Sequence, residues 1–307
     1  MERVLKRVKE ASDDESAYES QQQLKTVYHR LRSRRKLMEA YGLLSEGCKL
    51  QTSNEQMTCA GELGRLLLDA YCADGCPADS EHAELVLDIL DHLLAKQEEF
   101  ASEGKLQAAS EGCKVAQAAL KWAKQQDNKQ LMMLLHNKAA KLHVASCAPD
   151  ALAAASASFA RGADSAAFAT ALAASAKQAP SSERTLFSTR AALLILAAAQ
   201  TDGLRRRAEY AREVVDAFSA QVPCHERQQK PLIHFTDGLL QAVEIRSVRL
   251  LELLEREYRP GLMQDRELLG LLEAVKQKHF GGPRGGLGGL LGSLFQNLGS
   301  DQGVATA

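Results

Sequence analysis

The sequence predicts an all-α protein, an α-solenoid of tetratricopeptide-like helical hairpins in a single elongated domain. Residues that favour helices, such as alanine, leucine, glutamate, lysine and arginine, dominate the chain, whereas β-branched and aromatic residues are sparse. Apolar residues recur at helical spacing, as at Leu24, Val27, Tyr28 and Leu31. Pairs of such segments repeat roughly every 40 to 50 residues, a period at which hairpins bury their apolar faces by stacking. No clean tetratricopeptide consensus is present.

The composition indicates a folded, soluble protein of the cytosol. Its 307 residues are 45% hydrophobic and carry a formal net charge of -1, so any charge-driven binding must be local. The seven cysteines show no disulfide framework spacing, which fits reduced thiols. The N-terminus has no apolar signal core, and the most apolar run, residues 193–199, is too short to cross a bilayer.

The first half of the chain, residues 1–148, is predicted to hold a short N-terminal helix and three helical hairpins. Ser33 and Arg34 are the expected tight turn of the first hairpin. Short segments with Gly, Asp, Asn or Pro separate the later helices. The predicted helices after the first are 18–32, 37 to about 46 or 51, 55–71, 80–99, 106–124 and 129–146.

The second half, residues 149–280, is predicted to continue the helical repeats. Residues 149–199 are very rich in alanine, which either permits close helix packing or reflects only a compositional habit of the source genome. The further helices are expected at 204–219, 232–245, 247–258 and 264–280. Prolines mark the expected joints, at Pro223, Pro231 and Pro260. The glycine-rich residues 281–307 are predicted to form a disordered tail.

Signals for catalysis or cofactor binding are weak. The glycine-rich stretch 281–292 lacks the Gly-Lys-Ser/Thr ending of a phosphate loop. Cys72, Cys76 and His82 fall short of the four ligands of a structural zinc site. No nucleophile elbow, metalloprotease helix or kinase signature occurs. We therefore expect no enzyme activity, no metal and no cofactor, and an enzyme with an unrecognised site is the last alternative.

A concentrated basic patch stands out, because the stretch that contains it has no acidic residue. This patch, the basic hairpin, consists of Lys25, Arg30, Arg32, Arg34, Arg35 and Lys36. It is either a solvated turn or a binding site for an acidic protein surface, which arginine contacts in bidentate fashion. Nucleic acid fits less well, because no basic stripe continues along the chain and only Tyr28 and Tyr41 lie nearby.

Three stretches of the sequence together resemble a known family. They are Tyr18 to Arg30 with Glu39 and Glu46-Gly47, then Ala119-Leu120-Lys121-Trp122, and then Tyr258 to Leu262 and His279 to Gly281 with the tail Gly288 to Gly292. In this order they resemble the Golgi-to-ER traffic protein 4 family of the guided-entry pathway for tail-anchored proteins. The resemblance implies a non-enzymatic scaffold whose first half docks on the targeting ATPase and whose second half holds a ubiquitin-like protein. It leaves open whether a further chaperone scaffold joins.

The resemblance also implies residues for the two partner sites. Family members anchor the ATPase through the place that the basic hairpin occupies here, and Glu62, with Asp69 as a rival, matches an acid that restrains ATP hydrolysis. The ubiquitin-like protein is expected on residues 222–231 and the apolar positions that follow, for which a role in the helix core is an equally good explanation. These positions are Val222, Leu232, Ile233, Phe235, Leu239, Leu240 and Val243.

We therefore predict an adaptor, which acts by holding two partner proteins close to each other. The chain would bring the ATPase and the ubiquitin-like protein together for delivery of tail-anchored proteins to the ER membrane, without inserting into the membrane or binding nucleic acid. One alternative is another helical-repeat adaptor whose basic hairpin meets a different partner. A second is an RNA-binding solenoid, which predicts a steep salt dependence of RNA affinity.

Overall fold

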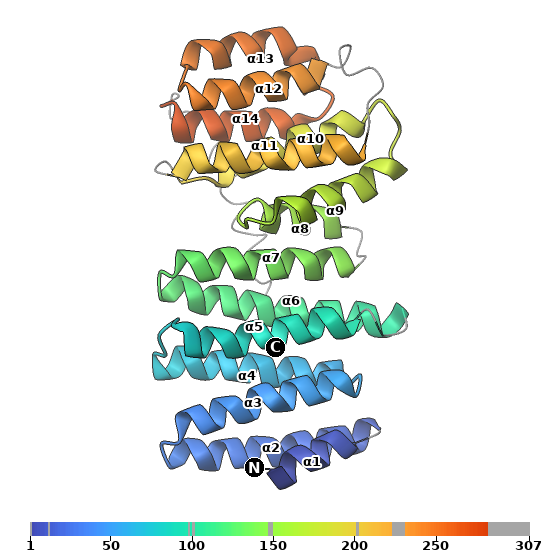
Figure 1. Cartoon of the computed structure of the whole chain (residues 1–307), viewed down its shortest axis with the longest axis vertical. Helices are drawn as coiled ribbons and strands as arrows, with labels where there is room; N and C mark the ends of the chain where they lie inside the picture. The colour runs from blue at the N-terminus through green and yellow to red at the C-terminus, as the bar shows by residue number, and fades with distance from the viewer. Residues whose placement is uncertain are drawn as a thin grey trace, which may run out of the picture. The chain divides into compact units, whose positions relative to one another are not determined.

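A computed structural model of the chain describes residues 2–11, 13–97, 99, 102–146, 150–200, 203–222 and 231–281 (Figure 1). These residues form fourteen α-helices and no strand, which confirms the predicted all-α fold. They divide into two compact units, of which unit 1 ends at Ala151 and unit 2 begins at Leu152. No helix in these ranges is both long and apolar enough to span a membrane. Of the predicted tail, only Gly281 is described.

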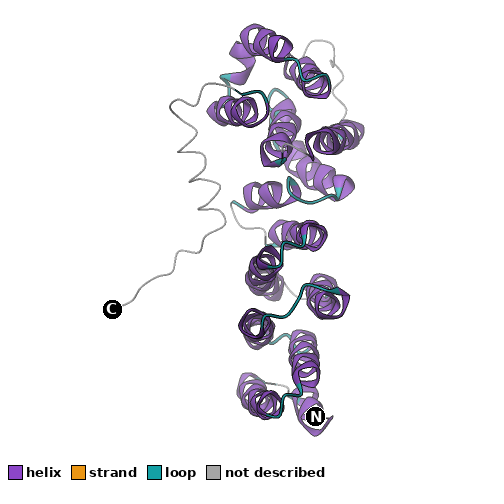
Figure 2. Cartoon of the chain, turned by 90° about the vertical axis from the view of Figure 1, so that its left-hand side faces the viewer, coloured by secondary structure: helices purple, strands orange, loops and turns teal. Residues whose placement is uncertain are grey.

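Unit 1 packs its helices in two layers. These helices are α1 (Glu2–Glu10), α2 (Asp14–Ser33), α3 (Leu37–Ser53), α4 (Met57–Asp74), α5 (Ser80–Gln97), α6 (Ser102–Gln125) and α7 (Lys129–Ala145). One layer runs α2, α4, α6 and the other runs α1, α3, α5, α7, as Figure 2 shows with the helices nearly end on. Although α4 and α5 were expected to form one hairpin, α4 packs mainly on α3 and α6, and α5 packs on α3, α6 and α7.

Four turns between consecutive helices share one construction. The backbone is left-handed at Arg35, Glu55, Asp127 and Arg246, with φ between 49° and 61°. In each turn the next N–H donates to the carbonyl five residues earlier, as from Lys36 to Leu31 over 3.0 Å, which closes the helix in a Schellman motif. None of the four residues is glycine, the usual choice for this conformation. The first of these turns lies at Arg34–Arg35, one residue later than the predicted Ser33–Arg34.

Aromatic side chains bind the two layers of unit 1 together. Tyr41, Tyr71 and Trp122 are fully buried and come from α3, α4 and α6. The ring centroids of Tyr41 and Tyr71 lie 4.9 Å apart, and those of Tyr71 and Trp122 lie 5.0 Å apart. The Trp122 indole N–H donates to the Cys76 carbonyl over 3.0 Å, so its polar atom is satisfied inside the core. These contacts fix the end of α4 that lies beside the basic hairpin.

Unit 2 is built around a central helix. Its helices are α8 (Ala151–Phe159), α9 (Ser165–Gln178), α10 (Arg184–Ala198), α11 (Leu204–Gln221), α12 (Pro231–Glu244), α13 (Val248–Leu262) and α14 (Arg266–His279). The central α10 contacts α9, α11, α12 and α14. Alanines of α9 and α10, such as Ala169, Ala173 and Ala192, are fully buried and let the backbones approach closely.

Pro260 does not form a joint, which corrects the sequence prediction. It lies inside α13, and the helix continues to Leu262. The Met263 N–H still donates to the Arg259 carbonyl over 2.9 Å, so the last turn is closed despite the proline. A proline removes one backbone donor and crowds the preceding turn, and this disturbance is confined to the frayed end of the helix.

Candidate functional site

The basic hairpin lies on the second half of α2 and on the turn that leads to α3. The fold separates its six members into two groups. Arg30 lies on the last turn of α2, and Arg34 and Arg35 form the connection itself. All three are exposed and have no carboxylate partner in the part of the chain that the structure describes. We call Arg30, Arg34 and Arg35 the free arginines.

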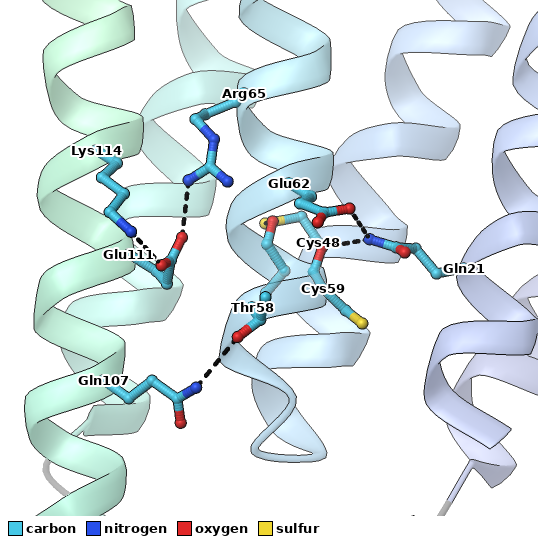
Figure 3. A network of polar contacts seen from close by, with 10 residues as sticks. Gln21, Cys48, Thr58, Cys59, Glu62, Arg65, Gln107, Glu111 and Lys114 are labelled. Carbon is cyan, nitrogen blue, oxygen red and sulfur yellow. Dashed lines mark hydrogen bonds and ion pairs between the residues drawn. The ribbon is translucent and has the colours of Figure 1, made fainter. Parts of the chain in front are cut away.

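Lys25 belongs to the second group, because Glu62 of α4 holds it. The Lys25 ammonium lies 2.8 Å from Glu62 Oε2. The buried Gln21 side chain donates to the same oxygen over 3.0 Å (Figure 3). Gln21 also donates to the Cys59 carbonyl over 3.1 Å, which ties α2 to α4. The hydrogen bond from Lys25 lowers the pKa of Glu62 below its ordinary value. Glu62 is therefore a fixed anion beside the basic hairpin.

Arg32 is held in the same way by Asp74, the last residue of α4. The Arg32 guanidinium pairs with Asp74 Oδ1 and donates to the Tyr28 hydroxyl over 3.3 Å. The Tyr41 hydroxyl donates to Asp74 Oδ2 over 2.7 Å and lies 3.2 Å from Cys76 Sγ. The hydrogen bond to Asp74 raises the pKa of Arg32. Both carboxylate oxygens of Asp74 are thus occupied within the molecule.

Lys36 completes the second group through a local pair. Its ammonium lies 2.7 Å from Glu39 Oε1, three residues later, and both side chains are about half exposed. The stretch of sequence that holds the basic hairpin lacks acids, yet three acids reach it in the fold. The Lys36 to Glu39 spacing was a local signal for one of them. Glu62 and Asp74 lie beside the basic hairpin only because α4 packs on α2 and α3. No short-range sequence pattern predicts that packing.

A second polar network, which sequence reasoning missed, joins α4 to α6. Glu111 accepts from Arg65 and from Lys114, each over 2.7 Å, and its side chain is only 10% exposed (Figure 3). Gly61 makes room for the buried Glu111 carboxylate, because a Cβ there would lie 2.3 Å from Glu111 Oε2.

Asp69 was the alternative to Glu62 as the acid that restrains ATP hydrolysis. It is exposed on α4 and has no ion pair within the described ranges. The two acids therefore differ in their contacts, because Glu62 is bound by Lys25 and Gln21.

The positions predicted to hold a ubiquitin-like protein lie in the core of unit 2. Phe235 is fully buried, with its ring centroid 6.1 Å from that of Tyr258. Ile233 is half-buried and is the most accessible of the seven. The six buried positions are Val222, Leu232, Phe235, Leu239, Leu240 and Val243. Residues 223–230, the middle of the expected segment, lie outside the described ranges. A partner contact at these positions stays a prediction.

The described residues contain no group of three or more His, Cys, Asp or Glu that could hold a metal ion. Two of the three residues weighed for zinc make other contacts. Cys76 Sγ meets the Tyr41 hydroxyl, and His82 Nδ1 lies 2.7 Å from Asp79 Oδ1. Burial raises the pKa of the Cys72 and Cys76 thiols, which disfavours the thiolate that a metal needs.

Comparison with known proteins places the chain in a family. The family model of Golgi to ER traffic protein 4 matches residues 34–298. The Golgi to ER traffic protein 4 homolog of Dictyostelium discoideum is 23% identical over 308 residues, which cover 99% of this chain and 92% of that protein. The crystal structure of C. therm. Get4 matches with a TM-score of 0.70 and 21% identity, and covers 100% of this chain and 96% of its own. The chain belongs to the Golgi to ER traffic protein 4 family.

Proposed function

We propose that the chain is a non-enzymatic scaffold of the cytosol that delivers tail-anchored proteins to the ER membrane by proximity. It would hold the targeting ATPase on unit 1 and a ubiquitin-like, chaperone-recruiting protein on unit 2. Membership of a Golgi to ER traffic family and the stacked helical architecture support this role. The single observation that carries it is the set of three exposed free arginines at the end of α2 and in the turn that follows.

The basic hairpin would contact an acidic surface of the ATPase. The free arginines offer guanidinium groups that can bind carboxylates in bidentate fashion at low reorganisation cost. Because these charges are solvated, they would steer association and make it sensitive to salt. Lys25, Arg32 and Lys36 would contribute positive charge from fixed positions. Glu62, held by Lys25, would be the acid that restrains ATP hydrolysis by the bound ATPase.

On unit 2 the ubiquitin-like protein would bind near the connection between α11 and α12. Ile233 is the predicted position that a partner could reach without rearrangement of the helices. The buried positions of α12, such as Phe235 and Leu239, would act by keeping this helix in place. The proposal needs neither direct membrane insertion nor nucleic acid.

The test is affinity purification of the full chain from its own cytosol at low and at moderate salt. We expect the ubiquitin-like protein at both salt concentrations and the ATPase mainly at low salt, because exposed ion pairs are screened. Recovery of neither protein, with a different helical-repeat assembly in their place, would support the alternative that the chain is another kind of adaptor subunit. Recovery of RNA with steep salt dependence would support the RNA-binding alternative.

A further inference from the structure

Asp74 occupies a position that is electrostatically unfavourable for its own helix. It is the last residue of α4, where the helix dipole repels a negative charge. Its side chain is nevertheless only 18% exposed, because Arg32 and Tyr41 enclose the carboxylate from α2 and α3. The charge therefore depends on these two partners for its stability.

Arg32 is the only arginine of the basic hairpin that has a described carboxylate partner. Its side chain is 34% exposed, but its terminal nitrogens are committed to Asp74 and to the Tyr28 hydroxyl. A guanidinium binds a carboxylate of a partner protein in bidentate fashion only when two of its N–H groups are free on one side. Within the described ranges no side chain or backbone group accepts from the free arginines, whereas each terminal nitrogen of Arg32 already donates, one to Tyr28 and one to Asp74. A carboxylate of a partner must therefore compete with Asp74 for Arg32.

We propose that Asp74 determines which arginines of the basic hairpin bind an acidic partner. By pairing with Arg32, Asp74 makes Arg32 less available, so that the partner is recognised mainly by the free arginines. The identity of the partner rests on the proposed function, whereas the division of the arginines rests on the contacts alone. Asp74 would also lower the affinity for any acidic surface, since it places a negative charge beside the site.

The test compares charge-conserving substitutions of one free and one held arginine in the full chain. Arg→Lys keeps the charge but removes the bidentate fork. Arg30→Lys and Arg32→Lys are each made in the wild type and in Asp74→Asn, whose amide oxygen can still accept from Tyr41. Affinity is measured for two probes, the purified targeting ATPase and a labelled oligoglutamate peptide.

We expect Arg30→Lys to weaken binding about two- to fivefold in both backgrounds, as for a solvated ion pair. Arg32→Lys keeps the positive charge that Arg32 contributes, so it should weaken wild-type binding less than Arg30→Lys does. In the Asp74→Asn background it should weaken binding as much as Arg30→Lys. Asp74→Asn alone should raise the affinity about two- to fivefold, because it frees Arg32 and removes a like charge.

The inference is overturned if Arg32→Lys weakens wild-type binding as much as Arg30→Lys does. If Asp74→Asn melts well below the wild type, the inference is tested only by comparing Arg30→Lys with Arg32→Lys in the wild-type background. If the expected pattern appears with oligoglutamate while the ATPase fails to bind, the proposed function is wrong and the inference stands. If the wild type binds neither probe, both are wrong.

Discussion

Two partner sites were predicted from sequence, the basic hairpin of unit 1 and the start of α12 in unit 2. They differ in how far their side chains are exposed. The free arginines are exposed at the end of α2 and in the turn after it, whereas Phe235, Leu239 and their neighbours lie in the core. A run of arginines cannot be buried without partners, so its exposure follows from its charge. Apolar residues at helical spacing are equally compatible with a core and with an interface, so their pattern alone locates neither.

Phe235→Ala tests whether α12 is core, and it has the largest expected effect. The Phe235 ring is fully buried and packs edge-on against Tyr258. Its removal should lower the free energy of unfolding of unit 2 by about 3–5 kcal/mol, measured by urea denaturation. The control is Ile233→Ala, which removes a half-buried side chain and should cost less. Unchanged stability of Phe235→Ala together with loss of the ubiquitin-like protein would show a partner site instead.

Charge reversal of the three free arginines to glutamate tests the other side of the comparison. We expect binding of the targeting ATPase to fall at least about 30-fold, because three attractive contacts become repulsive. Helix content should not change, since the three side chains are exposed. A matched control reverses three exposed arginines of unit 2 that have no ion pair in its described part, namely Arg206, Arg249 and Arg266. Equal loss of binding in the control would indicate a general charge effect.

Helical periodicity predicted most of the fold because it is a local property. The expected helix 204–219 corresponds to Leu204–Gln221, and 129–146 to Lys129–Ala145. Turns were harder to predict, because their left-handed positions carry Arg35, Glu55 and Asp127 in place of glycine. Proline was misleading at Pro260, where the helix absorbs it near its end.

The candidate site was predictable only in part for a similar reason. The charge run predicted a compact basic surface on one hairpin, since charged residues close together in sequence stay close in space. Which arginines are free depends on α4, whose acids lie 37 and 42 residues from their partners Lys25 and Arg32. The Glu111 network likewise joins residues 46 apart. Such contacts follow from tertiary packing, which a single sequence pattern does not encode.

Gly61→Ala tests how tightly α4 is seated on α6 beside the site. The added Cβ would lie 2.3 Å from Glu111 Oε2 and 3.0 Å from Glu111 Cβ, so the helices must shift or the carboxylate must leave Arg65. We expect the free energy of unfolding to fall by about 1–3 kcal/mol. Gly42→Ala is the matched control, because nothing lies within 4 Å of the new Cβ in the middle of α3. It should stabilise the protein by about 0.5–1 kcal/mol through helix propensity.

Lys25→Gln has the smallest expected effect and tests whether the held lysine differs from the free arginines. The Glu62 side chain is 43% exposed, so the pair should contribute no more than about 1 kcal/mol at neutral pH. Lys25 lowers the pKa of Glu62 from its ordinary value of 4.5, so the stabilisation is complete above that pH. It should be lost as the pH falls through the lowered pKa, where the carboxyl group becomes protonated in the folded protein.

The measurement is urea denaturation of wild type and Lys25→Gln at pH 7 and at pH 3. The difference between the two proteins should shrink at the lower pH, because the wild type loses the ion pair that the variant already lacks. Arg30→Gln is the control, since Arg30 has no carboxylate partner in the described ranges and should give a difference that does not depend on pH. A pH-independent cost for Lys25→Gln would mean that Lys25 stabilises α2 by packing and that its ion pair with Glu62 contributes nothing to stability.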